Sequence, residues 1–235
     1  MTTALVIGVG PGLGTALAKR FASGGLNVAV AARNSQRLEA LLPDLRDQGA
    51  PAAQAFACDV ANEAFVRETL REVIEALGVP RLVVFNAGTF VPKGLLETTP
   101  DEFENCWRVG CLGGFFVAQN AVRAMLEEAD SATNGTLGTL LFTGATASLR
   151  GGAGFHNLAV GKFGLRALSQ SLAREFGPQG IHVGHVIIDG QIQAQSTDSR
   201  HLTPAAIAEQ YWQLYQQPAG AWTQELDLRP YNESF

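Results

Sequence analysis

Short apolar runs rich in β-branched residues alternate along this chain with longer stretches in which apolar residues recur every three or four positions. Examples of the short runs are ALVIG at 4–8 and NVAVAA at 27–32, and an example of the longer stretches is FVRETLREVIEAL at 65–77. Strands that are apolar on both faces and separated by helices form a parallel sheet with helices on both sides. The alternation therefore predicts an α/β fold built on a doubly wound parallel β-sheet.

The same alternation continues along the whole chain. Further strands are expected at 53–60, 81–88, 138–144, 180–190 and 222–228, and further helices at 12–23, 38–48, 100–125, 155–176 and from Pro204 onward. No repeat, low-complexity tract or proline-rich linker divides these elements. We therefore interpret 1–235 as a single domain with a Rossmann fold, in which ligands bind at the carboxyl ends of the strands.

The composition excludes several classes of protein. Of the 235 residues, 46% are hydrophobic and 17% are charged, whereas disordered chains are rich in charge and poor in apolar residues. The formal net charge of −5 argues against nucleic acid as a partner, because nucleic-acid binding needs a basic surface. No run approaches the ~18 uninterrupted apolar residues of a membrane span, so we expect no membrane partner.

The cysteines and the N-terminus bear on the cellular compartment. Cys58, Cys106 and Cys111 are too few and too irregularly spaced for a disulfide framework or a CxxC metal site. The N-terminal MTTALVIGVG lacks the basic flank of a secretion signal and is interpreted as a buried first strand. We therefore expect a cytoplasmic protein without a metal ion.

A glycine-rich turn, GVGPGLG at 8–14, joins the first predicted strand to the first predicted helix. Glycine there permits a positive φ and lets the backbone approach a ligand closely, and the helix N-terminus presents N–H groups to a pyrophosphate. The dinucleotide fingerprint GxGxxG fails at Leu13, whereas GxxxGxG fits Gly8, Gly12 and Gly14. The turn predicts a nucleotide site, with a plain tight turn as the alternative.

The end of the second predicted strand distinguishes between two nicotinamide cofactors. An NAD site usually has an acidic residue there, which accepts a hydrogen bond from the ribose 2′-hydroxyl. This chain has Ala31-Ala32-Arg33-Asn34 instead, and Arg33 can pair with a 2′-phosphate through two hydrogen bonds. NADP is therefore favoured over NAD, and the alternative is that Arg33 is only a solvated residue at a strand end.

These motifs resemble the short-chain dehydrogenase/reductase family, and the resemblance extends from Gly8 to Gly190. It implies that Gly8, Gly12 and Gly14 hold the pyrophosphate of the cofactor. It also implies that Asp59-Val60 contacts the adenine and that Asn86-Ala87-Gly88 lies along the cofactor. The remaining cofactor contacts that the resemblance implies are at Leu13, Asn34, Gly190 and Ile192.

The resemblance implies four residues for the chemistry, and this chain keeps one of them. Lys162 matches the lysine that binds the nicotinamide ribose. Leu158 stands in place of the proton-transferring tyrosine, Ala145 in place of a serine, and Cys111 in place of an asparagine. The usual Pro-Gly after the sixth strand is Asp189-Gly190. The chain resembles an atypical branch of the family that lacks the Ser-Tyr catalytic residues.

Hydride transfer by this chain would need another proton donor. Histidine is the side chain best suited to proton transfer at neutral pH, so we name His156 together with Lys162 as candidate catalytic residues. The alternative for His156 is a polar residue in the loop before its helix. Strand alternation makes Thr146 a poor substitute, and Asp189 is either an acid in the site or a loop cap.

Two functions from different classes remain open. A third possibility is that the chain has also lost its nucleotide site. One is an NADP-dependent oxidoreductase acting on an unknown carbonyl or alcohol substrate with a non-standard proton donor. The other is a cofactor-binding protein without catalysis, serving as a sensor or assembly subunit. The resemblance further implies a homodimer or homotetramer, in which 191–235 covers the substrate or contacts another subunit.

Overall fold

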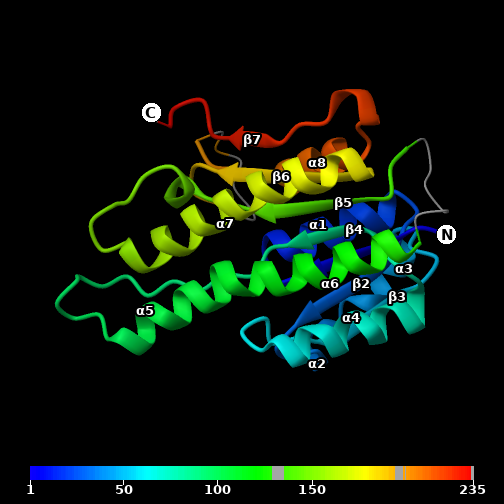
Figure 1. Ribbon diagram of the computed structural model, residues 1–235, viewed down its shortest axis with the longest axis horizontal. Helices are drawn as coiled ribbons and strands as arrows, with labels where there is room; N and C mark the ends of the chain where they lie inside the picture. The colour runs from blue at the N-terminus through cyan, green and yellow to red at the C-terminus, as the bar shows by residue number, and fades with distance from the viewer. Residues whose placement is uncertain (129–134, 194–197, 199, 234–235) are drawn as a thin grey trace.

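The computed structural model describes residues 1–128, 135–193, 198 and 200–233. Its strands form one seven-stranded parallel sheet in the order β3-β2-β1-β4-β5-β6-β7, which confirms the predicted α/β, doubly wound, single-domain fold (Figure 1). The strands are β1 (Thr3–Ile7), β2 (Asn27–Ala32), β3 (Ala53–Ala57), β4 (Pro80–Phe85), β5 (Gly138–Thr143), β6 (Ile181–Ile188) and β7 (Glu225–Leu228).

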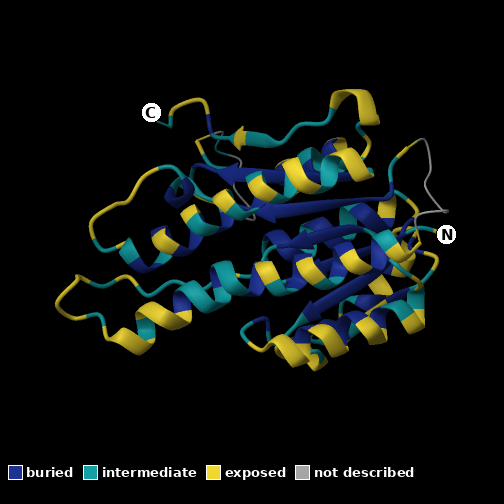
Figure 2. Cartoon of the chain, viewed as in Figure 1, coloured by how far each residue is buried: buried dark blue, intermediate teal, exposed yellow. Residues whose placement is uncertain are grey.

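Helices cover both faces of the sheet. The main ones are α1 (Leu13–Ser23), α2 (Gln36–Glu39), α3 (Leu42–Asp47), α4 (Glu63–Leu77), α5 (Pro100–Trp107), α6 (Gly113–Glu127), α7 (His156–Phe176) and α8 (Pro204–Tyr215). On one face, α1, α3 and α8 bury residues such as Leu17, Leu45 and Tyr211. On the other face, α4, α6 and α7 bury Val66, Val117 and Leu165. Figure 2 shows the sheet as the buried layer between these two sets.

The structure departs from the predicted helices in two places, and a proline explains the first of them. Pro43 lies in the first turn of α3, so the stretch expected as one interrupted helix is two short helices, α2 and α3. The long helix expected after Thr99 contains a π-helical turn, η1 (Arg108–Leu112), between α5 and α6. A side chain at Gly114 would come within 2.5 Å of Leu165, so α6 lies close against α7 there.

The helical stretch Pro100–Glu127 is long and apolar enough to span a membrane by length and composition alone. Half of the most apolar 18-residue segment of this stretch is buried inside the protein, where α6 packs against β4 and β5. A core helix of a doubly wound fold has this character, and the expected absence of a membrane partner stays a prediction.

The C-terminal segment 191–235, of which 194–197, 199, 234 and 235 lie outside the described residues, adds α8 and the edge strand β7. The hydroxyl of Tyr211 on α8 shares a hydrogen bond of 2.8 Å with the hydroxyl of Thr143 at the end of β5. The guanidinium of Arg20 on α1 lies 4.4 Å from the ring centre of Trp212. The described part of α8 therefore packs as a core helix, and a role in covering substrate or contacting a subunit stays a prediction.

Candidate functional site at the carboxyl edge of the sheet

The turns after β1 and β4 pack directly against each other. Gly8 has a φ of +91°, and a Cβ there would lie 2.4 Å from the backbone nitrogen of Ala87. The side-chain amide of Asn86 donates a hydrogen bond of 2.9 Å to the carbonyl oxygen of Gly8. Position 8 therefore requires glycine, and the structure brings the predicted pyrophosphate turn and Asn86-Ala87-Gly88 together.

The other two glycines of the motif have different roles. A Cβ on Gly14 would lie 2.7 Å from the Cα of Val9, so Gly14 permits close packing within the turn. A Cβ on Gly12 would meet nothing within 4 Å, so open space lies beside it. Gly12 precedes α1, whose N-terminus has no side-chain cap and no acidic residue in its first turn, while the side chain of Leu13 is buried in the core. This open, uncapped N-terminus fits an anionic group.

Arg33 and Asn34 are exposed beyond the end of β2. The side-chain oxygen of Asn34 accepts a long hydrogen bond of 3.4 Å from the backbone nitrogen of Arg37. In the part of the chain that the structure describes, no side-chain hydrogen bond or ion pair engages the guanidinium of Arg33. Arg37, which the sequence analysis missed, is also exposed and is the second residue of α2. Its spacing of four residues from Arg33 is the signal that would have found it.

Asp59 and Val60 follow β3 and face different surroundings. Asp59 is half-buried, and its Oδ1 accepts a hydrogen bond of 3.1 Å from the backbone nitrogen of Ala61. Val60 is buried against α6, where a Cβ on Gly113 would lie 2.9 Å from the Cβ of Val60. Val60 therefore packs in the core, and the predicted adenine contact of this pair stays a prediction.

Lys162 is buried at the same edge of the sheet. Its Nζ donates a hydrogen bond of 2.6 Å to the carbonyl oxygen of Thr143, the last residue of β5. A Cβ on Gly88 would lie 3.8 Å from this Nζ, so the ammonium group is beside the Asn86–Gly88 turn. Burial lowers the pKa of Lys162 to about 8, because removal from water disfavours the charged form.

The positions of the missing catalytic residues are filled by small or apolar side chains. Ala145 is extended, and its backbone nitrogen donates a hydrogen bond of 3.1 Å to the hydroxyl of Ser148. Cys111 lies in η1, where a Cβ on Gly164 of α7 would come within 2.7 Å of its sulfur. Burial raises the pKa of the Cys111 thiol. Neither the half-buried Leu158 nor Ala145 has a proton to transfer.

His156 and Lys162 lie on the same helix but contact different elements. The Nε2 of His156 shares a hydrogen bond of 3.1 Å with the hydroxyl of Thr98, in the loop before α5. Its ring stacks on Phe103 with centroids 6.2 Å apart. His156 is therefore hydrogen-bonded to the β4–α5 connection, whereas Lys162 is hydrogen-bonded to the end of β5. A catalytic role for His156 stays a prediction.

Gly190 and Ile192 lie just beyond β6. Gly190 has a φ of +152°, and a Cβ there would lie 2.7 Å from the ring of Pro230. Ile192 is 40% exposed and forms an isolated parallel bridge with Leu202. The C-terminal segment therefore reaches back to the carboxyl end of β6. In Figure 1 the arrows of β5 and β6 point to the side from which the loops before α5 and α7 project.

Comparison with known proteins agrees with this arrangement. The family model for short chain dehydrogenases matches residues 2–202. A curated short-chain dehydrogenase/reductase of Armillaria gallica is 32% identical over 212 residues, which cover 88% of this chain and 78% of that protein.

Solved structures show the same similarity over nearly the full length. A short-chain dehydrogenase from Rhodopseudomonas palustris has 41% identity and a TM-score of 0.85, covering 98% of this chain and 99% of that one. An alcohol dehydrogenase from Thermococcus sibiricus, complexed with 5-hydroxy-NADP, has the same fold at 24% identity and a TM-score of 0.88, covering 100% of this chain and 99% of that one. The chain belongs to the short-chain dehydrogenase/reductase family.

Proposed function

We propose that this chain is an NADP(H)-dependent oxidoreductase that acts on a carbonyl or alcohol substrate with a non-standard proton donor. The observation that carries the proposal is the placement of Lys162, buried at the carboxyl edge beside Gly88 and hydrogen-bonded to Thr143. A buried cation is costly to maintain, and this one lies beside the Asn86–Gly88 turn, which packs against the glycine turn.

The residues present fit a phosphorylated dinucleotide. The uncapped N-terminus of α1 and the open space beside Gly12 suit a pyrophosphate. Arg33 and Arg37, both exposed beyond β2, suit a 2′-phosphate. A solved structure of the same fold, a metagenomic short-chain oxidoreductase, is in complex with NADP. When bound, the nicotinamide supplies the hydride or accepts it. Lys162 would hold the adjoining ribose through its ammonium hydrogens.

A second candidate function is a cofactor-binding protein without catalysis. The observation that favours it is the hydrocarbon side chain of Leu158, four residues before Lys162, where the family has a phenol. Both functions use the same nucleotide site, so nucleotide binding alone does not separate them.

The test combines a binding titration with a substrate panel. We expect NADPH fluorescence to report binding to the wild-type protein and to report much weaker binding to Lys162→Met. The matched control is Lys19→Met on α1, which removes a lysine paired with Asp44 at the surface. Oxidation of NADPH by a member of a carbonyl panel supports the enzyme. Binding without turnover supports the second candidate, and absence of binding overturns both.

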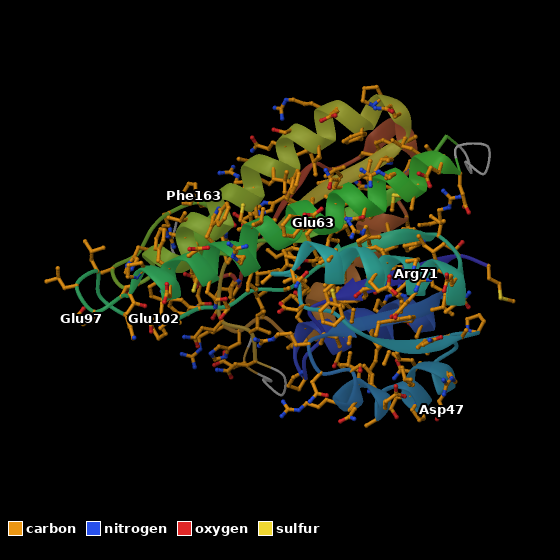
Figure 3. All side chains as sticks on the ribbon, turned by 60° about the horizontal axis from the view of Figure 1, so that its bottom comes forward. Asp47, Glu63, Arg71, Glu97, Glu102 and Phe163 are labelled. Carbon is orange, nitrogen blue, oxygen red and sulfur yellow. The ribbon has the colours of Figure 1, made fainter. Side chains whose placement is uncertain are left out.

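We also propose that the chain forms a homodimer through α6 and α7. A groove of about 530 Å³ lies between these helices, and its apolar lining includes Phe115, Val122, Leu172 and Phe176. Phe163, labelled in Figure 3, is 43% exposed on α7, one of the two helices that line the groove. Exposed aromatic residues beside an apolar groove are typical of a subunit interface.

Sedimentation measurements test the dimer with a closely matched pair of variants. Phe115 in the groove and Phe65 on α4 are both 41% exposed. We expect Phe115→Glu to yield monomers and Phe65→Glu to leave the dimer intact. A monomeric wild-type protein would contradict the proposal. Cytoplasmic location is proposed with it, because Cys58, Cys106 and Cys111 are all free thiols.

A further inference from the structure

At the carboxyl edge of the sheet, between the ends of β5 and β6, a hydroxyl group is hydrogen-bonded to a carboxylate. The Oγ1 of Thr146 donates a hydrogen bond of 2.5 Å to the Oδ1 of Asp189. Thr146 begins the short 3-10 turn η3 (Thr146–Ser148), three residues beyond the end of β5, and Asp189 directly follows β6. Hydroxyl donors bonded to a carboxylate form short, strong hydrogen bonds, so the two side chains act as a unit.

Asp189 is a buried anion with cationic partners. It is 1% exposed, and its Oδ2 lies 3.1 Å from the Nη2 of Arg229. The Nη2 of Arg150 lies 4.0 Å from Oδ1, and Arg229 also pairs with the more exposed Asp227. A buried carboxylate is retained where its charge is compensated, and here two guanidinium groups and one hydroxyl face it.

The direction of the hydrogen bond leaves the hydroxyl oxygen as an acceptor. Thr146 has one hydroxyl hydrogen, which it donates to Asp189, so the lone pairs of its Oγ1 remain for another donor. Thr146 is partly exposed whereas Asp189 is buried. The pair therefore joins the buried carboxylate of Asp189 to a partly exposed residue whose hydroxyl oxygen can accept one more hydrogen bond.

The pair lies at the same strand ends as Lys162. β5 and β6 are adjacent, with Thr143 paired to Val186, and the carbonyl of Thr143 holds the ammonium group of Lys162. The residues before Thr146 are Gly144 and Ala145, which bring no bulky side chain to this edge. The hydroxyl of Thr146 and the ammonium group of Lys162 therefore both lie at the carboxyl ends of β5 and β6.

We propose that Thr146 and Asp189 form the proton-handling pair of this enzyme in place of the absent phenol, an inference that rests on the proposed oxidoreductase function. In alcohol oxidation the substrate O–H bond breaks and its proton passes to Oγ1 of Thr146. The original hydroxyl proton of Thr146 passes to Oδ1 of Asp189. The hydride on the carbinol carbon leaves to the oxidised nicotinamide nucleotide, so the alcohol becomes a carbonyl and Asp189 becomes neutral. Carbonyl reduction reverses each transfer.

Three variants separate the transfer of a proton from the packing of the turn. Thr146→Val keeps the shape and removes the hydroxyl, and Thr146→Ser restores a hydroxyl. Asp189→Asn removes the proton acceptor. The matched control is Asp227→Asn, which removes the other carboxylate partner of Arg229 without touching Thr146. All are compared with the wild-type protein for turnover, for NADPH binding and for thermal unfolding.

We expect Thr146→Val and Asp189→Asn to lower turnover by about 10²–10⁴-fold while NADPH affinity stays within about twofold, because loss of a general acid or base has that effect. Thr146→Ser should recover most of the rate, and Asp227→Asn should keep it. Turnover of Thr146→Val at the wild-type rate would overturn the inference alone. A wild-type protein that binds NADPH and turns over no substrate would overturn the proposed enzyme function and this inference with it.

A second readout does not depend on activity. In protein labelled with ¹³C at aspartate side-chain carboxyl groups, the signal missing from Asp189→Asn identifies Asp189. We expect this signal to move when NADP⁺ is added and to move less with NADPH, because only the oxidised nicotinamide ring is positively charged. Equal responses to the two nucleotides, or none, would place the pair away from the nicotinamide and overturn the inference even if Asp189→Asn folds poorly.

Discussion

His185 on β6 and Glu225 on β7 face each other across neighbouring strands, with 3.3 Å between Nδ1 and the nearer carboxylate oxygen. On the other side of the ring, Nε2 lies 3.5 Å from the hydroxyl of Ser148. Glu225 is held in turn by two hydrogen bonds of 2.7 Å from Arg166. Burial outweighs the attraction of Glu225 and lowers the pKa of His185 to about 4.

This buried histidine predicts a specific pH dependence of stability. Because an unfolded histidine has a pKa of about 6.5, the unfolded chain binds more protons than the folded protein between pH 6.5 and pH 4. The stability that neutral His185 contributes is complete above pH 6.5 and is lost as the pH falls toward 4, by about 3 kcal/mol. Urea unfolding should therefore show a slope over this interval that His185→Gln reduces. His201→Gln, at a half-exposed site, is the control, and an unchanged slope in His185→Gln would contradict the prediction.

The two glycines at the start of α1 should separate binding from folding. Gly12→Ala adds a methyl group to open space, so its melting temperature should fall less than that of Gly14→Ala, whose Cβ would lie 2.7 Å from the Cα of Val9. In contrast, Gly12→Ala should weaken NADPH binding, because the added methyl group occupies the open space in front of the N-terminus of α1. Calorimetry and fluorescence titration measure the two effects. Full NADPH affinity in Gly12→Ala would show that the nucleotide does not approach this residue.

Arg33→Ala should weaken NADPH binding selectively. Hydrogen bonds to a charged group contribute about 1.5–3 kcal/mol, so the loss should be roughly 10–100-fold for NADPH. NADH lacks the 2′-phosphate, and its affinity should change by less than about twofold. Arg67→Ala on α4 is the matched surface control. An equal loss for both nucleotides would refute recognition of the 2′-phosphate by Arg33.

Leu158→Tyr should introduce the missing phenol four residues before Lys162. In a Thr146→Val background we expect it to raise turnover by at least about tenfold, because a positioned acid typically contributes 10²–10⁴-fold. The control is Leu158→Phe, because phenylalanine has nearly the size of tyrosine but no hydroxyl, and this variant should not raise turnover. Rates measured from pH 6 to pH 9 check the comparison. Equal rates for the Tyr and Phe variants would mean that position 158 does not face the reacting atoms.

The predicted nucleotide site depends on local spacing. The turn at Gly8, Gly12 and Gly14 joins one strand to the next helix, and such a turn has a spacing set by backbone geometry alone. Lys162 is a candidate because of its position in a helix, and Arg33 because of its position at a strand end. Each of these signals is contained in a few consecutive residues.

The hydrogen-bonded residue pairs at the ends of β5, β6 and β7 could be found only from the tertiary structure. Thr146 and Asp189 are 43 positions apart, and His185 and Glu225 are 40 positions apart. Strand alternation does not extend to Thr146, because the chain leaves β5 at Thr143 and enters a 3-10 turn at Thr146. The amino-acid sequence by itself determined the alternation of strands and helices, the glycine turn and the loss of the phenol. Only the order β5-β6-β7 and the side-chain directions at the strand ends decided which polar groups meet, because a contact between distant residues depends on packing that no local pattern encodes.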